Sequence, residues 1–173
     1  MKKKKPNGHH DQGAASPLSG EPAHALALAE GERMSEDDFD RELEDLLVKH
    51  ERLVLKPYRC TAGKLTIGVG RTLDDNGITV PEAKMLLRHD LTRTRFALEK
   101  VLPGFLALSK PRRMALIDMC FNLGLPRFLQ FKQMLAAVVA GDFNRAAKEM
   151  LSSAWATQVG QRAQTLATMM QEG

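Results

Sequence analysis

The chain has 173 residues, of which 43% are hydrophobic and 27% are charged, and its formal net charge at pH 7 is +4. This composition is ordinary for a globular protein with one sizeable core. It excludes a disulfide framework, because there are only two cysteines, and a bilayer-spanning segment, because no apolar run is long enough.

The charge is unevenly distributed along the chain. Residues 1–34 carry a net charge of +1, residues 35–45 carry −6 and residues 46–173 carry +9. A basic body favours an anionic polymer as partner, which leaves a cell-wall polymer and nucleic acid open. Aromatic residues make up only 5% of the chain and no basic–aromatic stacking motif is present, so we expect no nucleic-acid partner.

Residues 1–34 are rich in Ala, Gly, Pro, Ser and Lys and show no sustained apolar periodicity. We predict a disordered tail over 1–34 and one domain over 35–173. The apolar run at 25–29 is too short and too late for the hydrophobic region of a signal peptide. We therefore expect a monomer that is made in the cytoplasm without its own export signal and is not stably inserted in a membrane.

The first predicted helix begins after Ser35 and ends near Glu51. Ser35 is a good N-cap, and Asp38 is placed to act as the acidic partner of a capping box. Several residues follow helical spacing and predict an apolar stripe along one face of this helix. They are Phe39, Leu43, Leu46, Leu47 and His50.

A short β region follows this helix. The segment 58–80 predicts two or three small strands, with turns at Ala62-Gly63 and Asn76-Gly77. Thr79 is then expected to cap the next helix in a capping box with Glu82.

The remainder of the chain is predicted to be helical, with helices over 80–101, 111–123, 127–140, 142–152 and 157–171. The helix over 111–123 is apolar on most faces, which is typical of a central buried helix. Cys120 lies within it and is expected to be a buried small hydrophobic residue.

Three side chains that can take part in chemistry fall at fixed offsets around the β region. Glu51 ends the first helix, Cys60 follows nine residues later and Thr66 six residues after that. A carboxyl at a helix end that faces two groups on a hairpin can form a cleft. Apolar neighbours of the acid would favour its protonated form, as a general acid requires. These neighbours are Leu53, Val54, Leu55 and Tyr58.

Each of the three residues also has a plainer interpretation. Glu51 could be a surface carboxyl at a helix end, Cys60 an inert buried thiol, and Thr66 an ordinary β-branched strand residue. We expect no metal at Cys60, because no second Cys or His lies at ligand spacing, and we expect no cofactor.

The stretch from Glu51 to Arg71 resembles the signature of the phage-type lysozymes, glycoside hydrolase family 24. That signature is Glu, eight residues, Asp or Cys, five residues, Thr, ending in TIGxGH or a near variant. Glu51, Cys60 and Thr66 fit these intervals. The other positions that fit are Tyr58, Gly63, Ile67, Gly68 and Gly70, and the resemblance extends over about residues 36–172.

The resemblance implies an α+β, mainly helical fold, with a small β-hairpin lobe and a helical C-terminal body. It implies hydrolysis of the β-1,4 bonds between N-acetylmuramic acid and N-acetylglucosamine in peptidoglycan, in phage lysis or wall penetration. Glu51 would protonate the leaving oxygen and Thr66 would orient the water. Cys60 would act as a base or as a nucleophile. Without a signal, the wall would be reached through a holin-type pore or by delivery with a virion.

The resemblance is weaker in the C-terminal half. It implies that Asn122, in MCFNLG, faces the cleft. In SAWATQVGQRA it implies that Gln158 lines the cleft and that Arg162 approaches Glu51. Trp155 in the same segment is interpreted as core packing rather than as a direct sugar contact.

Three positions depart from the commoner family pattern, and one of them is Arg71, which stands where His often closes the signature. The residue after the acid is usually Gly and here is Arg52, so we expect the backbone there to avoid positive φ. Cys60 stands where Asp is commoner, and a free thiol is only a few per cent thiolate near pH 7. The neighbouring cations Lys56, Arg59 and Lys64 would raise that fraction by lowering the thiol pKa.

Two alternatives to hydrolysis stay open. A lytic transglycosylase uses one Glu and forms a 1,6-anhydro sugar, and in that chemistry Cys60 and Thr66 would both be spare. A non-catalytic wall-binding module would use the basic body without cleaving the polymer.

Overall fold

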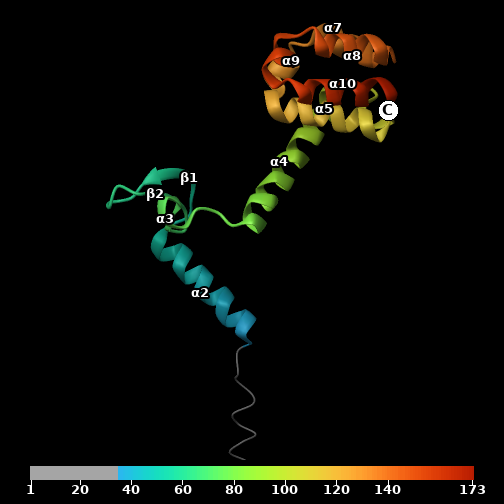
Figure 1. The fold of residues 1–173 in the computed structure, drawn as a ribbon. Helices are drawn as coiled ribbons and strands as arrows, with labels where there is room; N and C mark the ends of the chain where they lie inside the picture. Colours follow the sequence, from blue (N-terminus) through green and yellow to red (C-terminus); the bar gives the residue numbers. More distant parts are fainter. Residues whose placement is uncertain (1–34) are drawn as a thin grey trace, which may run out of the picture. The chain divides into compact units, whose positions relative to one another are not determined.

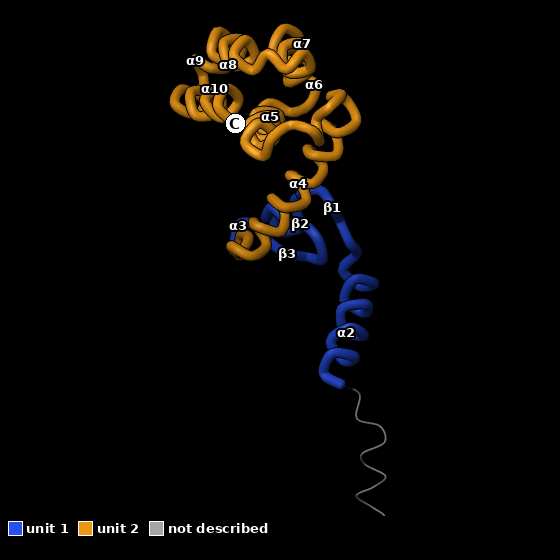
Figure 2. The backbone as a smooth tube through the Cα atoms, turned by 90° about the vertical axis from the view of Figure 1, so that its right-hand side faces the viewer, with its two compact units in different colours: residues 1–75 blue, residues 76–173 orange. Residues whose placement is uncertain are grey.

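The computed structural model describes residues 35–173, so the predicted tail over 1–34 lies outside the described residues. The chain divides into two compact units, which are coloured separately in Figure 2. The boundary in the sequence falls between Asp75 and Asn76. Unit 1 is described here over residues 35–75 and unit 2 over residues 76–173. The interpretation of 35–173 as one domain stays a prediction.

Unit 1 consists of one long helix, a small sheet and the start of a short helix. These are α2 (Glu36–Glu51), β1 (Val54–Arg59), β2 (Leu65–Gly68), β3 (Arg71–Thr72) and α3 (Leu73–Asn76). The sheet is antiparallel in the order β1-β2-β3. The predicted small sheet is therefore confirmed, and it follows α2 directly (Figure 1).

Helix α2 has the predicted start and end. The Ser35 hydroxyl accepts from the Asp38 N–H at 3.1 Å and donates to the Asp38 carboxylate at 2.7 Å. The predicted apolar stripe lies on α2, but the helix has no buried residue. The stripe is therefore present as predicted, but unit 1 does not bury it.

The expectation that Arg52 avoids positive φ is wrong. Arg52 has φ +66° and ψ 141°, and it is the one non-glycine residue of 35–173 with positive φ. Its N–H still donates to the Val48 carbonyl at 3.0 Å, and β1 begins two residues later. The change of chain direction at the helix end therefore falls on Arg52, in a positive-φ conformation that glycine adopts without strain.

The hairpin between β1 and β2 turns at Cys60–Gly63. The Gly63 N–H donates to the Cys60 carbonyl at 2.8 Å, and the Cys60 N–H donates to the Lys64 carbonyl at 3.0 Å. Gly63 has φ +77°, which a three-residue hairpin loop requires at this position. The predicted turn at Ala62-Gly63 is confirmed.

Pro57 lies inside β1, where the pairing between β1 and β2 is irregular. Proline has no N–H to donate, and β1 is an edge strand of the sheet, so the position is compatible with a strand. Val54 pairs with Gly68, and Tyr58 pairs with Thr66.

Unit 2 is helical throughout. It contains α4 (Val80–Val101), the 3₁₀ turn η1 (Phe105–Ala107), α5 (Lys110–Leu123), α6 (Leu125–Phe128), α7 (Lys132–Val139), α8 (Phe143–Leu151), α9 (Ala154–Val159) and α10 (Gln161–Glu172). Thr79 and Glu82 form the predicted capping box at the start of α4. The predicted helix over 80–101 has the observed bounds.

Helix α5 is central to unit 2. It packs against α4, α6 and α10, and α8 packs on α10, so that α10 lies between α5 and α8 (Figure 1). Its buried residues are Ala115, Leu116, Met119 and Cys120. Cys120 is thus the buried thiol that the sequence predicted, and burial raises its pKa to about 11.

Two of the predicted helices have wrong bounds. The helix expected over 127–140 is divided into α6 and α7, and α6 begins before Pro126 because proline is tolerated in the first helical turn. The helix expected over 157–171 is also divided. Ser153 caps α9, and Gly160, with φ +56° and ψ −121°, separates α9 from α10. The predicted mainly helical α+β fold is nevertheless confirmed.

Arg112 joins α5 to two other helices of unit 2. Its guanidinium lies over the Phe143 ring at 3.7 Å, and its Nε and an Nη donate to the carbonyls of Met170 and Gln171 at 2.9 and 3.2 Å. The last carbonyls of α10 thereby gain donors that the helix itself cannot provide. None of the helices in the described chain is both long and apolar enough to cross a membrane.

Candidate active site

Glu51 is the last residue of α2, and its carboxylate lies against the turn between β2 and β3. A Cβ atom placed on Gly70 would lie 3.3 Å from Glu51 Oε2. Gly70 also has φ +68°. Glycine is therefore needed there for two reasons: the backbone conformation, and the close approach of the carboxylate. The acid therefore lies beside the glycine-rich end of LTIGVG.

Cys60 and Thr66 lie on the same hairpin. Cys60 opens the turn, and Thr66 is on β2 opposite Tyr58. The carbonyl of Lys64 accepts from both residues, from the Cys60 N–H at 3.0 Å and from the Thr66 Oγ1 at 3.1 Å. The Thr66 side chain is almost fully buried and the Cys60 thiol is partly accessible. Two of the three predicted catalytic residues thus share one backbone acceptor.

The pKa of the Cys60 thiol lies below its ordinary value. The main cause is a hydrogen bond from the backbone of Ala62, followed by hydrogen bonds from the Thr66 hydroxyl and the Lys64 backbone, all of which favour the thiolate. From the sequence we expected nearby cations to lower the pKa of this thiol. The structure instead places the Arg59 guanidinium on the Gly63 carbonyl at 2.7 Å and Lys64 on Asp75, so hydrogen-bond donors have the larger effect.

Lys64 is the residue through which the hairpin contacts α3. Its ammonium donates to both carboxylate oxygens of Asp75, at 2.8 and 2.7 Å. The next backbone N–H, that of Leu65, donates to Asp74 Oδ2 at 2.8 Å. From the sequence we interpreted Asp74 and Asp75 only as part of a turn. The available signal was two neighbouring acids directly after a short strand.

The apolar wall predicted around Glu51 is formed only in part by unit 1. Val54 and Tyr58 are half-buried, whereas Leu53 and Leu55 are 56% and 78% exposed. Glu51 itself is exposed. The apolar neighbours in the sequence therefore do not enclose the carboxyl within this unit.

Of the predicted substrate-side residues, Asn122 is held by Trp155. The Trp155 Nε1–H donates to Asn122 Oδ1 at 2.8 Å. Trp155 is 4% exposed and meets the Phe131 ring edge-on, with centroids 6.4 Å apart. The interpretation of Trp155 as core packing is thus confirmed. Gln158 is exposed on α9.

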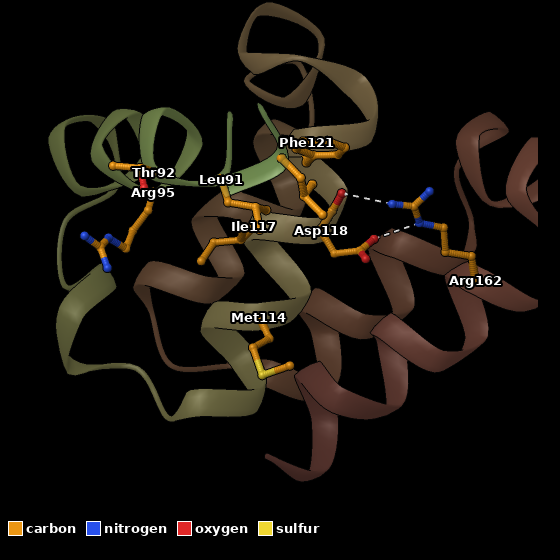
Figure 3. Close-up of a pocket in the computed structure, with 9 residues that line it drawn as sticks. Leu91, Thr92, Arg95, Met114, Ile117, Asp118, Phe121 and Arg162 are labelled. Atoms are coloured by element: carbon orange, nitrogen blue, oxygen red, sulfur yellow. Dashed lines mark hydrogen bonds and ion pairs between the residues drawn. The ribbon is translucent and has the colours of Figure 1, made fainter. Parts of the chain in front are cut away.

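Arg162 is paired with an acid that the sequence did not single out. Its Nε donates to Asp118 Oδ1 at 2.7 Å, at one side of a cavity of about 500 Å³ in unit 2 (Figure 3). The cavity is mainly apolar, with Leu87, Leu91, Met114, Ile117 and Phe121 in its walls. Asp118 is the only acid of the α5 sequence, and this was the available signal. The predicted approach of Arg162 to Glu51 stays a prediction.

The six predicted site residues thus fall into two groups, each within one unit. Glu51, Cys60 and Thr66 belong to unit 1, and Asn122, Gln158 and Arg162 belong to unit 2. Within residues 35–173 no three His, Cys, Asp or Glu side chains are grouped so that they could hold a metal ion. The chemistry available in unit 1 is that of a carboxyl, a thiol and a hydroxyl.

The sequence pattern of phage lysozymes matches residues 48–171, and this match includes all six residues. The chain belongs to the phage lysozyme family. Membership supports a lysozyme-type hydrolase that lyses peptidoglycan.

Three relatives of this phage lysozyme family member have different names. The pre-baseplate central spike protein Gp5 of Enterobacteria phage T4 is 28% identical over 167 residues, which cover 80% of this chain but only 29% of that protein. An endolysin of Acyrthosiphon pisum secondary endosymbiont phage 1 is 29% identical over 68% of this chain and 80% of its own length. A probable T4-type lysozyme 1 of Dictyostelium discoideum is 25% identical over 76% of this chain and 94% of its own length.

Proposed function

We propose that this family member is a muramidase, which hydrolyses the β-1,4 bonds between N-acetylmuramic acid and N-acetylglucosamine in peptidoglycan. The observation that carries the proposal is the position of the Glu51 carboxylate against the Gly70 backbone. It lies in the same unit as a hairpin on which Cys60 and Thr66 share the Lys64 carbonyl. Glycoside hydrolysis needs a proton donor for the leaving oxygen and a second group that delivers water or stabilises the cation.

In this mechanism Glu51 protonates the glycosidic oxygen as the bond breaks. Cys60, whose thiolate form is favoured by its hydrogen-bond donors, accepts the proton of the attacking water. The Thr66 hydroxyl has one hydrogen, which it can donate either to the Lys64 carbonyl or to the Cys60 sulfur. Its lone pairs can therefore accept a hydrogen bond from the water and orient it. Its hydrogen can donate to the Cys60 sulfur when the thiol is ionised.

A direct attack of the Cys60 sulfur on the anomeric carbon is the other path that these residues allow. It would give a covalent intermediate and retention of configuration, whereas a water attack assisted by Cys60 gives inversion. Nuclear magnetic resonance of the first product formed from a chitin or muropeptide oligomer distinguishes the two, because the α and β anomers have separate signals.

The substrate side of the proposal includes Asn122, Gln158 and Arg162. Asn122 has its carbonyl oxygen occupied by Trp155, so the amide nitrogen is the group it can offer to a sugar hydroxyl or acetamide. Arg162 is oriented by Asp118 and supplies fixed donors. We propose that it helps to hold the carboxyl of Glu51.

The proposed partner is peptidoglycan, on which the protein would act as a monomer, without nucleic acid and without stable insertion in a membrane. It would be made in the host cytoplasm. One relative is named an endolysin and another a spike protein, and these names correspond to the two routes to the wall, through a pore or with a virion.

The first test compares wild type with Glu51→Gln in a turbidity assay on purified peptidoglycan. We expect the rate of clearing to fall by about 10² or more, because a general acid contributes roughly 10²–10⁴ to the rate. Glu36→Gln, in the first turn of the same helix, is the matched control and should clear the suspension at the wild-type rate. Equal clearing by wild type and Glu51→Gln would remove Glu51 as the acid.

The second test concerns the thiol. We expect Cys60→Asp to retain activity, because a carboxylate can perform the same proton transfer, and Cys60→Ala to lose most of it. Cys120→Ala removes the buried thiol of unit 2 and should be as active as wild type. A fully active Cys60→Ala variant would leave Cys60 with a packing role only.

Mass spectrometry of the released muropeptides distinguishes hydrolysis from the alternatives. Fragments with reducing ends support a muramidase. Anhydro ends would identify a lytic transglycosylase, and binding to the wall without fragments would identify a binding module.

A further inference from the structure

The hairpin that holds Cys60 and Thr66 is fastened at one point to α3. The ammonium of Lys64 is bound by both oxygens of Asp75, and the adjoining Leu65 N–H is bound by Asp74. Three hydrogen bonds thus act on two consecutive residues, and they come from acids nine and eleven residues further along the chain. We call these four residues the α3 clamp: Lys64, Leu65, Asp74 and Asp75.

We propose that Asp74 and Asp75 are positioning residues, which hold the Lys64 carbonyl where it can orient the Cys60 backbone and the Thr66 hydroxyl together. The proposal rests on the muramidase function proposed above. It identifies the residues that keep the Cys60 thiol and the Thr66 hydroxyl in position.

The Lys64 carbonyl is the link between the α3 clamp and the catalytic candidates. It accepts from the Cys60 N–H at 3.0 Å and from Thr66 Oγ1 at 3.1 Å. The same residue's side chain is held by Asp75, and the other end of its peptide group is held by Asp74 through the Leu65 N–H. A peptide group is planar, so fixing the Leu65 N–H also fixes the direction of the Lys64 carbonyl.

The α3 clamp also has an electrostatic effect, which acts in the opposite direction. Several charged side chains lie on this hairpin or on the elements next to it: Lys56 and Arg59 on β1, Lys64 before β2, Arg71 on β3, and Asp74 and Asp75 on α3. Asp75 neutralises Lys64, the cation closest in sequence to the thiol's donors. Removing the Asp75 charge would leave Lys64 uncompensated and would favour the thiolate.

The two roles therefore predict opposite changes in Cys60. If Asp75 acts only through its charge, the Asp75→Asn variant should have a lower thiol pKa. If it holds the hairpin, the same variant loosens the donors of Ala62, Lys64 and Thr66, and the thiol pKa should rise. The positioning role predicts a rise of about one pH unit, the size expected when hydrogen bonds to an ionised group are weakened.

The test uses the full chain with Cys120→Ala, so that Cys60 is the one thiol. The rate of alkylation by iodoacetamide is measured against pH in this parent and in its Asp75→Asn and Asp74→Ala variants, and the kinetics of peptidoglycan clearing are measured on the same proteins. We expect a raised thiol pKa and a kcat about tenfold lower in both variants, with KM within about twofold, because a misaligned catalytic group affects the reaction step rather than binding.

Two further variants separate positioning from general damage. Glu149→Gln breaks the surface pair with Arg145 on α8 and should change neither the thiol pKa nor kcat. The exchange Lys64→Asp with Asp75→Lys restores an ion pair at the same place and should recover most of the kcat lost in Asp75→Asn. This exchange also gives a result if the single variants fold poorly.

The proposal is overturned if the thiol pKa stays unchanged or falls in Asp75→Asn and Asp74→Ala, or if, in a parent protein that clears peptidoglycan, the exchanged pair recovers no activity. The alkylation measurement needs no wall substrate, so the two proposals can fail separately. A raised thiol pKa in a protein that releases no muropeptides supports the α3 clamp and overturns the muramidase function. An unchanged pKa in a protein that does release them overturns the α3 clamp alone.

Discussion

Replacing Gly70 by alanine tests whether the contact between the β2–β3 turn and Glu51 matters for catalysis. Gly70 has φ +68°, and a methyl group there would lie 3.3 Å from Glu51 Oε2. The positive φ alone costs an L-residue about 1–2 kcal/mol, offset by roughly 0.4–1 kcal/mol from the reduced freedom of the unfolded chain. We expect Gly70→Ala to lower the free energy of unfolding by about 1 kcal/mol.

Gly68 provides the matched control, because its φ is +69° and nothing lies within 4 Å of the position a Cβ would take. Gly68→Ala should therefore lose the same stability without touching the acid. The methyl of Gly70→Ala requires the carboxylate to move by a few tenths of an ångström, which we expect to lower kcat about tenfold, since misplacement by 1 Å can cost about 10².

Both variants are measured by thermal unfolding and by the clearing of peptidoglycan under saturating substrate. The reasoning predicts equal melting temperatures and unequal kcat values for the two proteins. Equal kcat values would refute it, because the prediction depends on the contact with Glu51, which a Cβ at Gly70 would make and a Cβ at Gly68 would not. A kcat ratio that persists when both proteins are assayed well below their melting temperatures would support it.

Three further predictions concern stability. Arg52→Gly removes the strain of a side chain at φ +66° and should raise the free energy of unfolding by about 1 kcal/mol in a denaturant titration, whereas Arg52→Ala should not. The Lys64–Asp75 pair lowers the pKa of Asp75 below 3.8 and raises the pKa of Lys64 above 10.5. The difference in melting temperature between wild type and Asp75→Asn should therefore be fully present between pH 3.8 and pH 10.5. It should disappear as the pH falls through the pKa of Asp75 in the folded protein, or rises through that of Lys64. Trp155→Phe leaves Asn122 without its donor and should cost about 1 kcal/mol in the same titration; an unchanged value would contradict the hydrogen bond.

Local sequence signals were sufficient to predict where a helix starts when its capping residues are close in sequence. The Thr79–Glu82 capping box predicted the start of α4, and Ser35 predicted the start of α2. Each of these caps satisfies backbone groups within three residues of itself, so the sequence contains the whole interaction. The same holds for the turn at Ala62-Gly63, where one glycine sets the geometry.

Signals that depend on packing were not sufficient. The break between α6 and α7 falls where Phe131 meets Trp155, a contact between segments far apart in the sequence. Arg52 takes a conformation that its residue type disfavours, at the point where α2 ends and the chain turns into β1. A single-residue preference is worth only about 1 kcal/mol, so the tertiary structure can override it.

The candidate site shows the same division between what is local and what is not. Glu51, Cys60 and Thr66 could be predicted because their offsets follow from a helix that ends at the acid and a hairpin of fixed length. Asp74 and Asp75 could not, because their partners are known only once the chain returns past the hairpin and places α3 beside Lys64. The signature therefore indicates the candidate reacting groups, whereas the acids that hold the hairpin are found only in the fold. Substitutions at Asp74 and Asp75 test how this hairpin is held, and substitutions at Glu51, Cys60 and Thr66 test whether those groups react.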